Sequence, residues 1–157
     1  MELSWKTQTE PLDLKEVSRS CGKGDLDGAL SYTQRALKID EKFYGSDHPN
    51  VAILATNIGM ILKNKGDLGG ALTYSQRALK VGEKVYGPDH PTVAIFGNNV
   101  GQILKDRGDL DEALSYTQRA LKILQKSYGP DNPPTRMVAE NLEEIERAIQ
   151  LRANSRK

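Results

Sequence analysis

The sequence lacks most of the features that mark secreted, membrane-bound or nucleic-acid-binding proteins. Cys21 is its only cysteine, so the chain cannot form an internal disulfide, which fits a reducing compartment. The formal net charge is only +1, which gives no general attraction to phosphate backbones or anionic membrane surfaces. The longest apolar stretch, 51–62, is too short to span a bilayer, and the N-terminus does not resemble a signal peptide. We therefore expect a cytoplasmic protein with no nucleic-acid or membrane partner.

What the sequence does have is an internal repeat. Similar segments begin at Gly24, Gly66 and Gly108, so the second follows the first by 42 residues (66 − 24) and the third follows after the same interval (108 − 66). A constant period of this size predicts stacked supersecondary units, each too small to bury its own apolar face. Arrays of this kind offer long surfaces, so the repeat favours binding over catalysis.

Each repeat has the pattern of two helices joined by tight turns. After Pro49, apolar residues recur at three- and four-residue spacing, and a second such stripe follows Gly66 and Asp67, which suit a helix stop and the next helix cap. Gly59 and Gly101 occupy the same register and should be buried where the two helices of a pair cross closely. The pattern predicts no strands and seven helices, at 10–22, 26–42, 49–64, 68–84, 91–106, 110–127 and 133–152.

The spacing Asn57-Ile58-Gly59, Leu62, Gly66-Asp67-Leu68, Ala71 and Ala78-Leu79 resembles the tetratricopeptide repeat, whose usual period is 34 residues. The longer period and the link YGPDHPTVA, residues 86–94, are similar to the kinesin-light-chain type of this repeat. The resemblance covers about residues 24–150. It implies an all-α, right-handed superhelical solenoid of antiparallel helix pairs, and a scaffold that binds a protein or peptide on its concave face.

The two ends depart from the repeat. In the last helix Glu143 replaces Gly59 and Gly101, and Glu146 replaces a leucine, so this helix should present a polar outer face and cap the array. Residues 1–23 form an N-terminal segment with a degenerate first helix, which is either a short cap or disordered before Leu12. The expected solenoid spans 24–152, with about three repeats plus the capping helix, and 153–157 is a basic tail.

Helical geometry selects the residues that the first helices should turn toward a ligand. If Ala55 and Gly59 face the second helix of their pair, the opposite side of each first helix lines a groove. The predicted peptide-binding residues are Ile53, Asn57, Met60, Lys63, Ile95, Asn98, Asn99, Gln102, Lys105 and Asn141.

Two ladders run through this set, with one member in each repeat. Asn57, Asn99 and Asn141 could hydrogen-bond the backbone of an extended peptide, or each could tie its helix to a neighbour and contact no ligand. Lys63 and Lys105, continued by Arg147, suggest an acidic ligand, although a solvated charged face explains them equally well.

No residues in the sequence form a recognisable catalytic, cofactor or metal site. There is no glycine-rich phosphate loop and no nucleophile paired with a base. His48 and His90 stand in equivalent turns, too far apart to share a metal, so helix capping or packing is the expected role. We therefore predict a non-enzymatic protein without cofactor or metal. Two alternatives stay open: self-assembly into homo-oligomers through the solenoid ends, or service as one interaction domain of a larger signalling protein.

Overall fold

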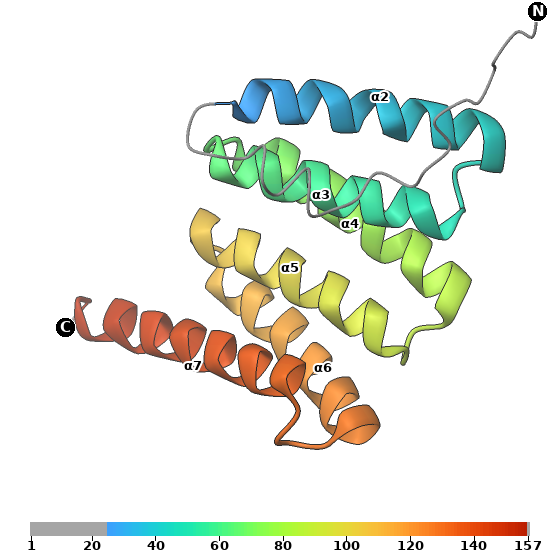
Figure 1. Ribbon diagram of the computed structural model, residues 1–157. Coiled ribbons are helices and arrows are strands. Elements are labelled where there is room, and N and C mark those ends of the chain that lie inside the picture. The colour runs from blue at the N-terminus through green and yellow to red at the C-terminus, as the bar shows by residue number, and fades with distance from the viewer. Residues whose placement is uncertain (1–24, 157) are drawn as a thin grey trace, which may run out of the picture.

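The structure, a computed structural model, describes residues 25–156, and every regular element in that range is an α-helix. The helices stack in chain order from α2 to α7 (Figure 1). Their bounds are α2 Leu26–Tyr44, α3 Pro49–Asn64, α4 Leu68–Tyr86, α5 Pro91–Arg107, α6 Leu110–Tyr128 and α7 Pro133–Asn154. Six predicted helices are thereby confirmed within one or two residues at each end, and the seventh, at 10–22, lies outside the described residues.

The helices alternate between two positions in the stack, which we call A and B. The A helices are α3, α5 and α7, each of which begins at a proline, and the B helices are α2, α4 and α6. Each helix packs on the next one along the chain, and the A helices also contact one another, α3 with α5 and α5 with α7. The chain is therefore an all-α solenoid of helix pairs.

Turn residues end one helix and start the next. Gly66 has a φ of +85°, a conformation that a side chain disfavours, and Asp67 then caps α4 by accepting a hydrogen bond from the backbone N–H of Gly70 at 2.9 Å. His48 and His90 cap α3 and α5 in the same way, through Nδ1. Their rings also stack on tyrosines one turn earlier, with centroids 4.5 and 4.9 Å apart. The predicted capping and packing role of the histidines is confirmed.

Small residues bring the two helices of a pair together. A Cβ atom added to Gly59 would lie 2.4 Å from Ser75 Oγ, and one added to Gly101 would lie 2.4 Å from Thr117 Oγ1. Both distances are far shorter than a van der Waals contact. The predicted burial of these glycines against the B helix of their own repeat is confirmed.

Successive B helices are joined by ion pairs between an arginine and the glutamate one repeat earlier. Arg77 of α4 pairs with Glu41 of α2, and Arg119 of α6 pairs with Glu83 of α4 at 2.7 Å. Arg119 also donates a hydrogen bond to the carbonyl oxygen of Pro88 at 3.0 Å. The two arginines therefore join successive repeats.

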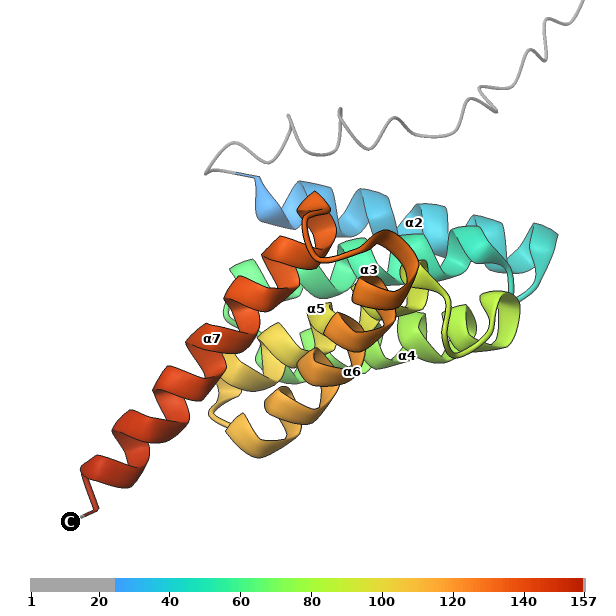
Figure 2. The ribbon, with the colours of Figure 1, turned by 90° about the horizontal axis from the view of Figure 1, so that it is seen from below.

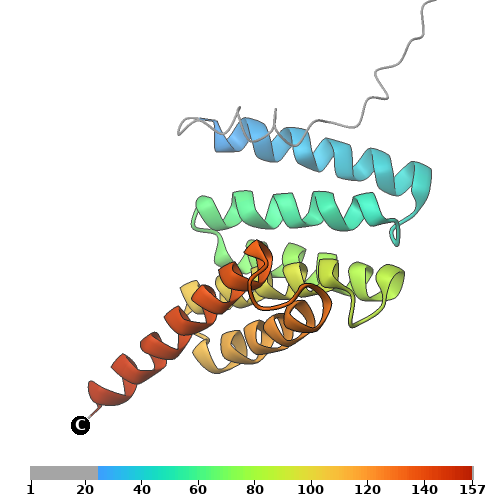
Figure 3. The same cartoon turned by 60° about the horizontal axis from the view of Figure 1, so that its bottom comes forward.

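The helix α7 closes the stack with a polar outer side. Val138 and Ile145 are fully buried against the preceding pair, whereas Glu143 and Glu146 are exposed. The C-terminal part of α7 extends beyond the ends of α5 and α6 (Figures 2 and 3). The burial pattern is that of a capping helix.

Candidate functional site

The A helices supply one surface that crosses all the described repeats. Because they contact one another across repeats, their exposed sides form one continuous surface of the stack. Residues that are 42 positions apart occupy equivalent places on successive A helices. Each such set of three residues therefore forms a row that crosses α3, α5 and α7. We name three of these rows: the apolar row of Ile53, Ile95 and Met137; the amide row of Asn57, Asn99 and Asn141; and the charged row of Lys63, Lys105 and Arg147 with their acidic partners.

The amide row divides into two kinds of asparagine. All three side chains are partly exposed. Within residues 25–156 no hydrogen bond engages the side chains of Asn57 or Asn99, but Asn141 Nδ2 donates to Asn98 Oδ1 at 3.1 Å. The structural role therefore holds for Asn141, while the side-chain amides of Asn57 and Asn99 make no hydrogen bond within residues 25–156.

The prediction that Asn98 lines an open groove is wrong. Its side chain is only 2% exposed and forms the tie between α5 and α7 through Asn141. The equivalent residue of the previous repeat is Thr56, whose hydroxyl donates to the carbonyl oxygen of Ala52 in its own helix. The polar tie is thus specific to the α5–α7 seam, and Asn98 belongs to the packing of the array.

The charged row is neutralised within the chain. Lys63 Nζ lies 3.1 Å from Asp106 Oδ2, and Lys105 Nζ lies 2.6 Å from Glu144 Oε2, so each lysine pairs with a carboxylate of the next A helix or its end. Arg147 pairs with Glu143 on its own helix at 3.2 Å. Each cation of this row therefore already faces a carboxylate of the described residues, and the preference for an acidic ligand stays a prediction.

The ion pair with Lys105 changes the pKa of Glu144. Lys105 hydrogen-bonds the carboxylate and attracts its negative charge, and together these effects lower the pKa of Glu144 below its ordinary value. Desolvation of the carboxyl group acts in the opposite direction and raises this pKa. The positive charges of Arg147 and Lys63 lower the pKa further. The carboxylate is therefore held in its charged, paired form.

Between the amide and charged rows lie Met60 and Gln102, both partly exposed. Gln102 Nε2 is buried and has no hydrogen-bond partner among the described residues. A buried amide N–H group without a partner is energetically unfavourable.

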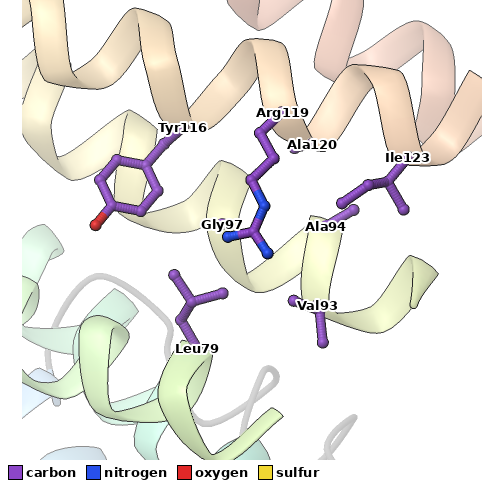
Figure 4. Close-up of a pocket in the computed structure, with 8 residues that line it drawn as sticks. All are labelled: Leu79, Val93, Ala94, Gly97, Tyr116, Arg119, Ala120 and Ile123. Atoms are coloured by element: carbon purple, nitrogen blue, oxygen red, sulfur yellow. The ribbon is translucent and has the colours of Figure 1, made fainter. Parts of the chain in front are cut away.

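Of two crevices in the described part of the chain, one lies among α4, α5 and α6 and the other lies between α2 and α4. One is a cavity of about 10 Å³, close to the space that a single water needs (Figure 4). The other is an open crevice of about 260 Å³, smaller than a typical ligand pocket and spanned by the Arg77–Glu41 pair. Neither supplies the enclosed apolar volume of a small-molecule site. The first is lined by Leu79, Val93, Ala94, Gly97, Tyr116, Arg119, Ala120 and Ile123.

Neither a metal-binding cluster nor a membrane-spanning helix is found in the described part of the chain. Over residues 25–156, no three His, Cys, Asp or Glu side chains are grouped so that they could hold a metal ion. In the same range no helix is both long enough and apolar enough to cross a membrane.

Comparisons with known proteins agree with this architecture. Two models, each described as tetratricopeptide repeat, match residues 51–92 and 94–152, and no curated protein matches the chain. Among solved structures, BtubC (BKLC) from P. vanneervenii superposes with a TM-score of 0.74 and 28% identity, over 81% of this chain and 51% of that one.

A candidate kinesin light chain from Podosopora anserina, with nearly identical TPR-like repeats, gives a TM-score of 0.80 at 15% identity, over 87% of this chain and 64% of that one. A second structure of that protein, in which one glutamine is replaced by methionine, gives the same values. The chain thus spans between half and two thirds of the length of these solved chains. Tetratricopeptide repeats are generally protein–protein interaction scaffolds without enzymatic activity. The chain belongs to the tetratricopeptide-repeat family, and its fold is similar to that of the solved kinesin-light-chain repeats.

Proposed function

We propose that this protein is a non-enzymatic scaffold that binds an extended segment of a partner protein along the concave face of its solenoid, residues 24–152. The observation that carries the proposal is the pair Asn57 and Asn99. They occupy the same position in successive A helices, they are partly exposed, and no hydrogen bond within the described residues uses their side chains.

An amide side chain offers both a donor and an acceptor, and an extended backbone offers both in return. Asparagine is also a mediocre helix former, so its recurrence at one register is explained by such contacts. Loss of one amide that bonds a peptide backbone costs about 1–2 kcal/mol of binding free energy. Binding in the cytoplasm fits the single cysteine of the chain.

Self-assembly through the solenoid ends is disfavoured at one end. Glu143 stands where Gly59 and Gly101 allow a B helix to approach, so a second copy cannot continue the stack beyond α7 with the same close crossing. Light scattering over a range of concentrations tests this point, and a mass that rises with concentration would favour assembly.

The proposal is tested by selecting binders from a displayed library of random dodecapeptides with the full chain. Peptides that bind the wild type should lose affinity for the Asn57→Ala/Asn99→Ala variant by about tenfold or more. The variant Gln76→Ala removes an exposed side-chain amide from the B helix α4 and serves as the matched control. If the selected peptides bind the double Asn variant as tightly as the wild type, recognition lies elsewhere and the proposal fails.

A further inference from the structure

The helices α2 and α6 share a stretch of identical sequence that has different surroundings in the two places. Residues 31–39 of α2 and 115–123 of α6 both read SYTQRALKI. In α6 the last residue of this stretch, Ile123, is 7% exposed, whereas its equivalent in α2, Ile39, is 52% exposed. Both helices are followed by an A helix that packs on them, so the difference arises on the side that faces the preceding helices.

The uncovered side of α2 is an apolar patch. Tyr32, Ile39 and Phe43 are seven (39 − 32) and four (43 − 39) residues apart, so their side chains share one side of the helix. Tyr32 is 51% and Phe43 is 74% exposed. In α4, by contrast, the equivalent of Ile39 is Val81, which is buried. We call Tyr32, Ile39 and Phe43 the α2 patch.

The helices before α6 show what the shared sequence packs against. Arg119, Ala120 and Ile123 of α6 line one small cavity together with side chains of α4 and α5 (Figure 4). Ala120 and Ile123 belong to a buried apolar cluster that also contains Ala94 of α5. Arg119 pairs with Glu83 of α4. The shared sequence therefore fits a helical surface that offers small or apolar side chains with a carboxylate beside them.

The cations beside the α2 patch lack the partners that their equivalents have. Arg77 of α4 pairs with Glu41 of α2, and the residue of α2 equivalent to Arg77 is Arg35. Arg35 and Lys42 are exposed, and no ion pair among the described residues includes either of them. A carboxylate that approached the α2 patch would therefore meet unpaired positive charge.

The sequence before α2 does not repeat the residues that cover α6. Ala94 and Gly97 of α5 line the cavity with the shared sequence, and the residues two periods earlier are Glu10 (94 − 84) and Asp13 (97 − 84). Carboxylates in place of an alanine and a glycine are unsuited to an apolar contact. In the register of the repeat, the chain therefore supplies no matching cover of its own for the α2 patch.

We propose that the α2 patch is a docking surface for a helical segment of a partner protein, one that carries small and apolar side chains with a carboxylate beside them. This surface is separate from the rows on the A helices. A second copy of this chain is a poor match, because its last B helix, α6, has Gln125 where α2 and α4 have Glu41 and Glu83. The outer side of its α7 is also polar.

A fluorescein-labelled peptide of residues 66–108 serves as the probe, because it contains α4 and α5, the pair that covers the shared sequence in α6. Fluorescence polarisation with the full chain should show saturable binding. Ile39→Asp should weaken this binding about tenfold or more, because a carboxylate replaces an apolar contact. Leu151→Asp is the matched control and should leave binding unchanged, since Leu151 is 69% exposed on α7, at the other end of the array.

A charge reversal tests the acidic part of the inference without altering the α2 patch. Arg35→Glu should weaken binding of the peptide about threefold to fivefold, because the pair with Glu83 of the peptide is lost. A peptide that carries Glu83→Arg should bind the Arg35→Glu protein more tightly than it binds the wild type. Thermal melting shows whether each variant is folded, and the charge reversal decides the matter even if Ile39→Asp is not.

Three outcomes overturn the inference. The first is a wild-type chain that does not bind the peptide saturably. The second is an Ile39→Asp protein that binds it as tightly as the wild type, or a Leu151→Asp protein that is weakened as much as Ile39→Asp. The third is a Glu83→Arg peptide that does not prefer the Arg35→Glu protein. None of these measurements involves Asn57 or Asn99, so the scaffold proposal depends only on its own test.

Discussion

The close crossing of α5 and α6 can be tested by adding one methyl group at Gly101. The new Cβ would lie 2.4 Å from Thr117 Oγ1 and 3.3 Å from the carbonyl oxygen of Ala113, so the two helices must separate or Thr117 must move. Overpacking of this kind costs about 1–3 kcal/mol. Alanine gains about 1 kcal/mol over glycine in a helix interior. We therefore expect Gly101→Ala to lower the free energy of unfolding by about 1 kcal/mol.

The same helix provides a matched control. A Cβ atom added to Gly97, one turn earlier in α5, has no neighbour within 4 Å. Gly97→Ala should therefore express the helix-propensity gain alone and raise the free energy of unfolding by about 0.5–1 kcal/mol. The two single-methyl variants should thus shift stability in opposite directions and differ by about 2 kcal/mol.

A second change should restore the packing. Thr117 Oγ1 is buried and has no hydrogen-bond partner among the described residues, so Thr117→Ala removes the obstructing atom without breaking a bond in that range. In the Gly101→Ala background it should recover the lost stability. Urea denaturation monitored by circular dichroism gives the free energy of unfolding of four proteins: the wild type, Gly97→Ala, Gly101→Ala and the double variant Gly101→Ala/Thr117→Ala. A Gly101→Ala protein as stable as Gly97→Ala, or one that Thr117→Ala does not improve, would refute the close-crossing argument.

Substitutions at three other positions test the contacts between A helices and the helix caps described above. Asn141→Ala should lower the free energy of unfolding by about 1–3 kcal/mol, because it leaves the buried Asn98 amide without its partner; unchanged denaturation would show that the tie is dispensable. His90→Ala should destabilise the fold by about 0.5–2 kcal/mol because it removes the helix cap, whereas His90→Asp should not, because aspartate can also cap. Thermal melting measures both variants, and equal losses of stability would argue against capping. By carbon-detected NMR titration, Lys105→Met should raise the pKa of Glu144 toward its ordinary value, and an unshifted titration would contradict the pairing. Because that pKa is lowered in the folded chain, the small stability contribution of the pair is present above the carboxyl's unfolded pKa and fades as pH falls through the folded value.

The fold could be derived from the sequence because its determinants recur in each repeat. Gly59 and Gly101 share a register with each other, and so do the helix caps Asp25 and Asp67. Each signal is local, since a glycine, a proline or an apolar stripe acts within its own helix. The B helices run slightly further than expected because nothing interrupts them before the glycine that follows each terminal tyrosine.

The details of the candidate site could not be derived in the same way. In the Asn98–Asn141 bond and the Lys105–Glu144 pair, one partner differs from its equivalent in the preceding repeat: Asn98 replaces Thr56, and Glu144 replaces Gln102. Where α5 has Asn98, α3 has Thr56, and the repeat pattern alone does not reveal which side chains meet across the seam. Helical register indicates which side of a helix is buried, but it cannot distinguish a groove residue from one at the edge of a seam.

The polar side of α7 also determines how such an array can change its length. A unit such as 66–107 presents compatible surfaces to the units before and after it, so duplication of that segment would insert a further helix pair and one more position in each row. A unit placed after α7 would instead meet Glu143 where a B helix must pass over glycine. Duplication of such an internal unit, in evolution or by design, would therefore lengthen the array while keeping a glycine at the close helix crossing of the added unit.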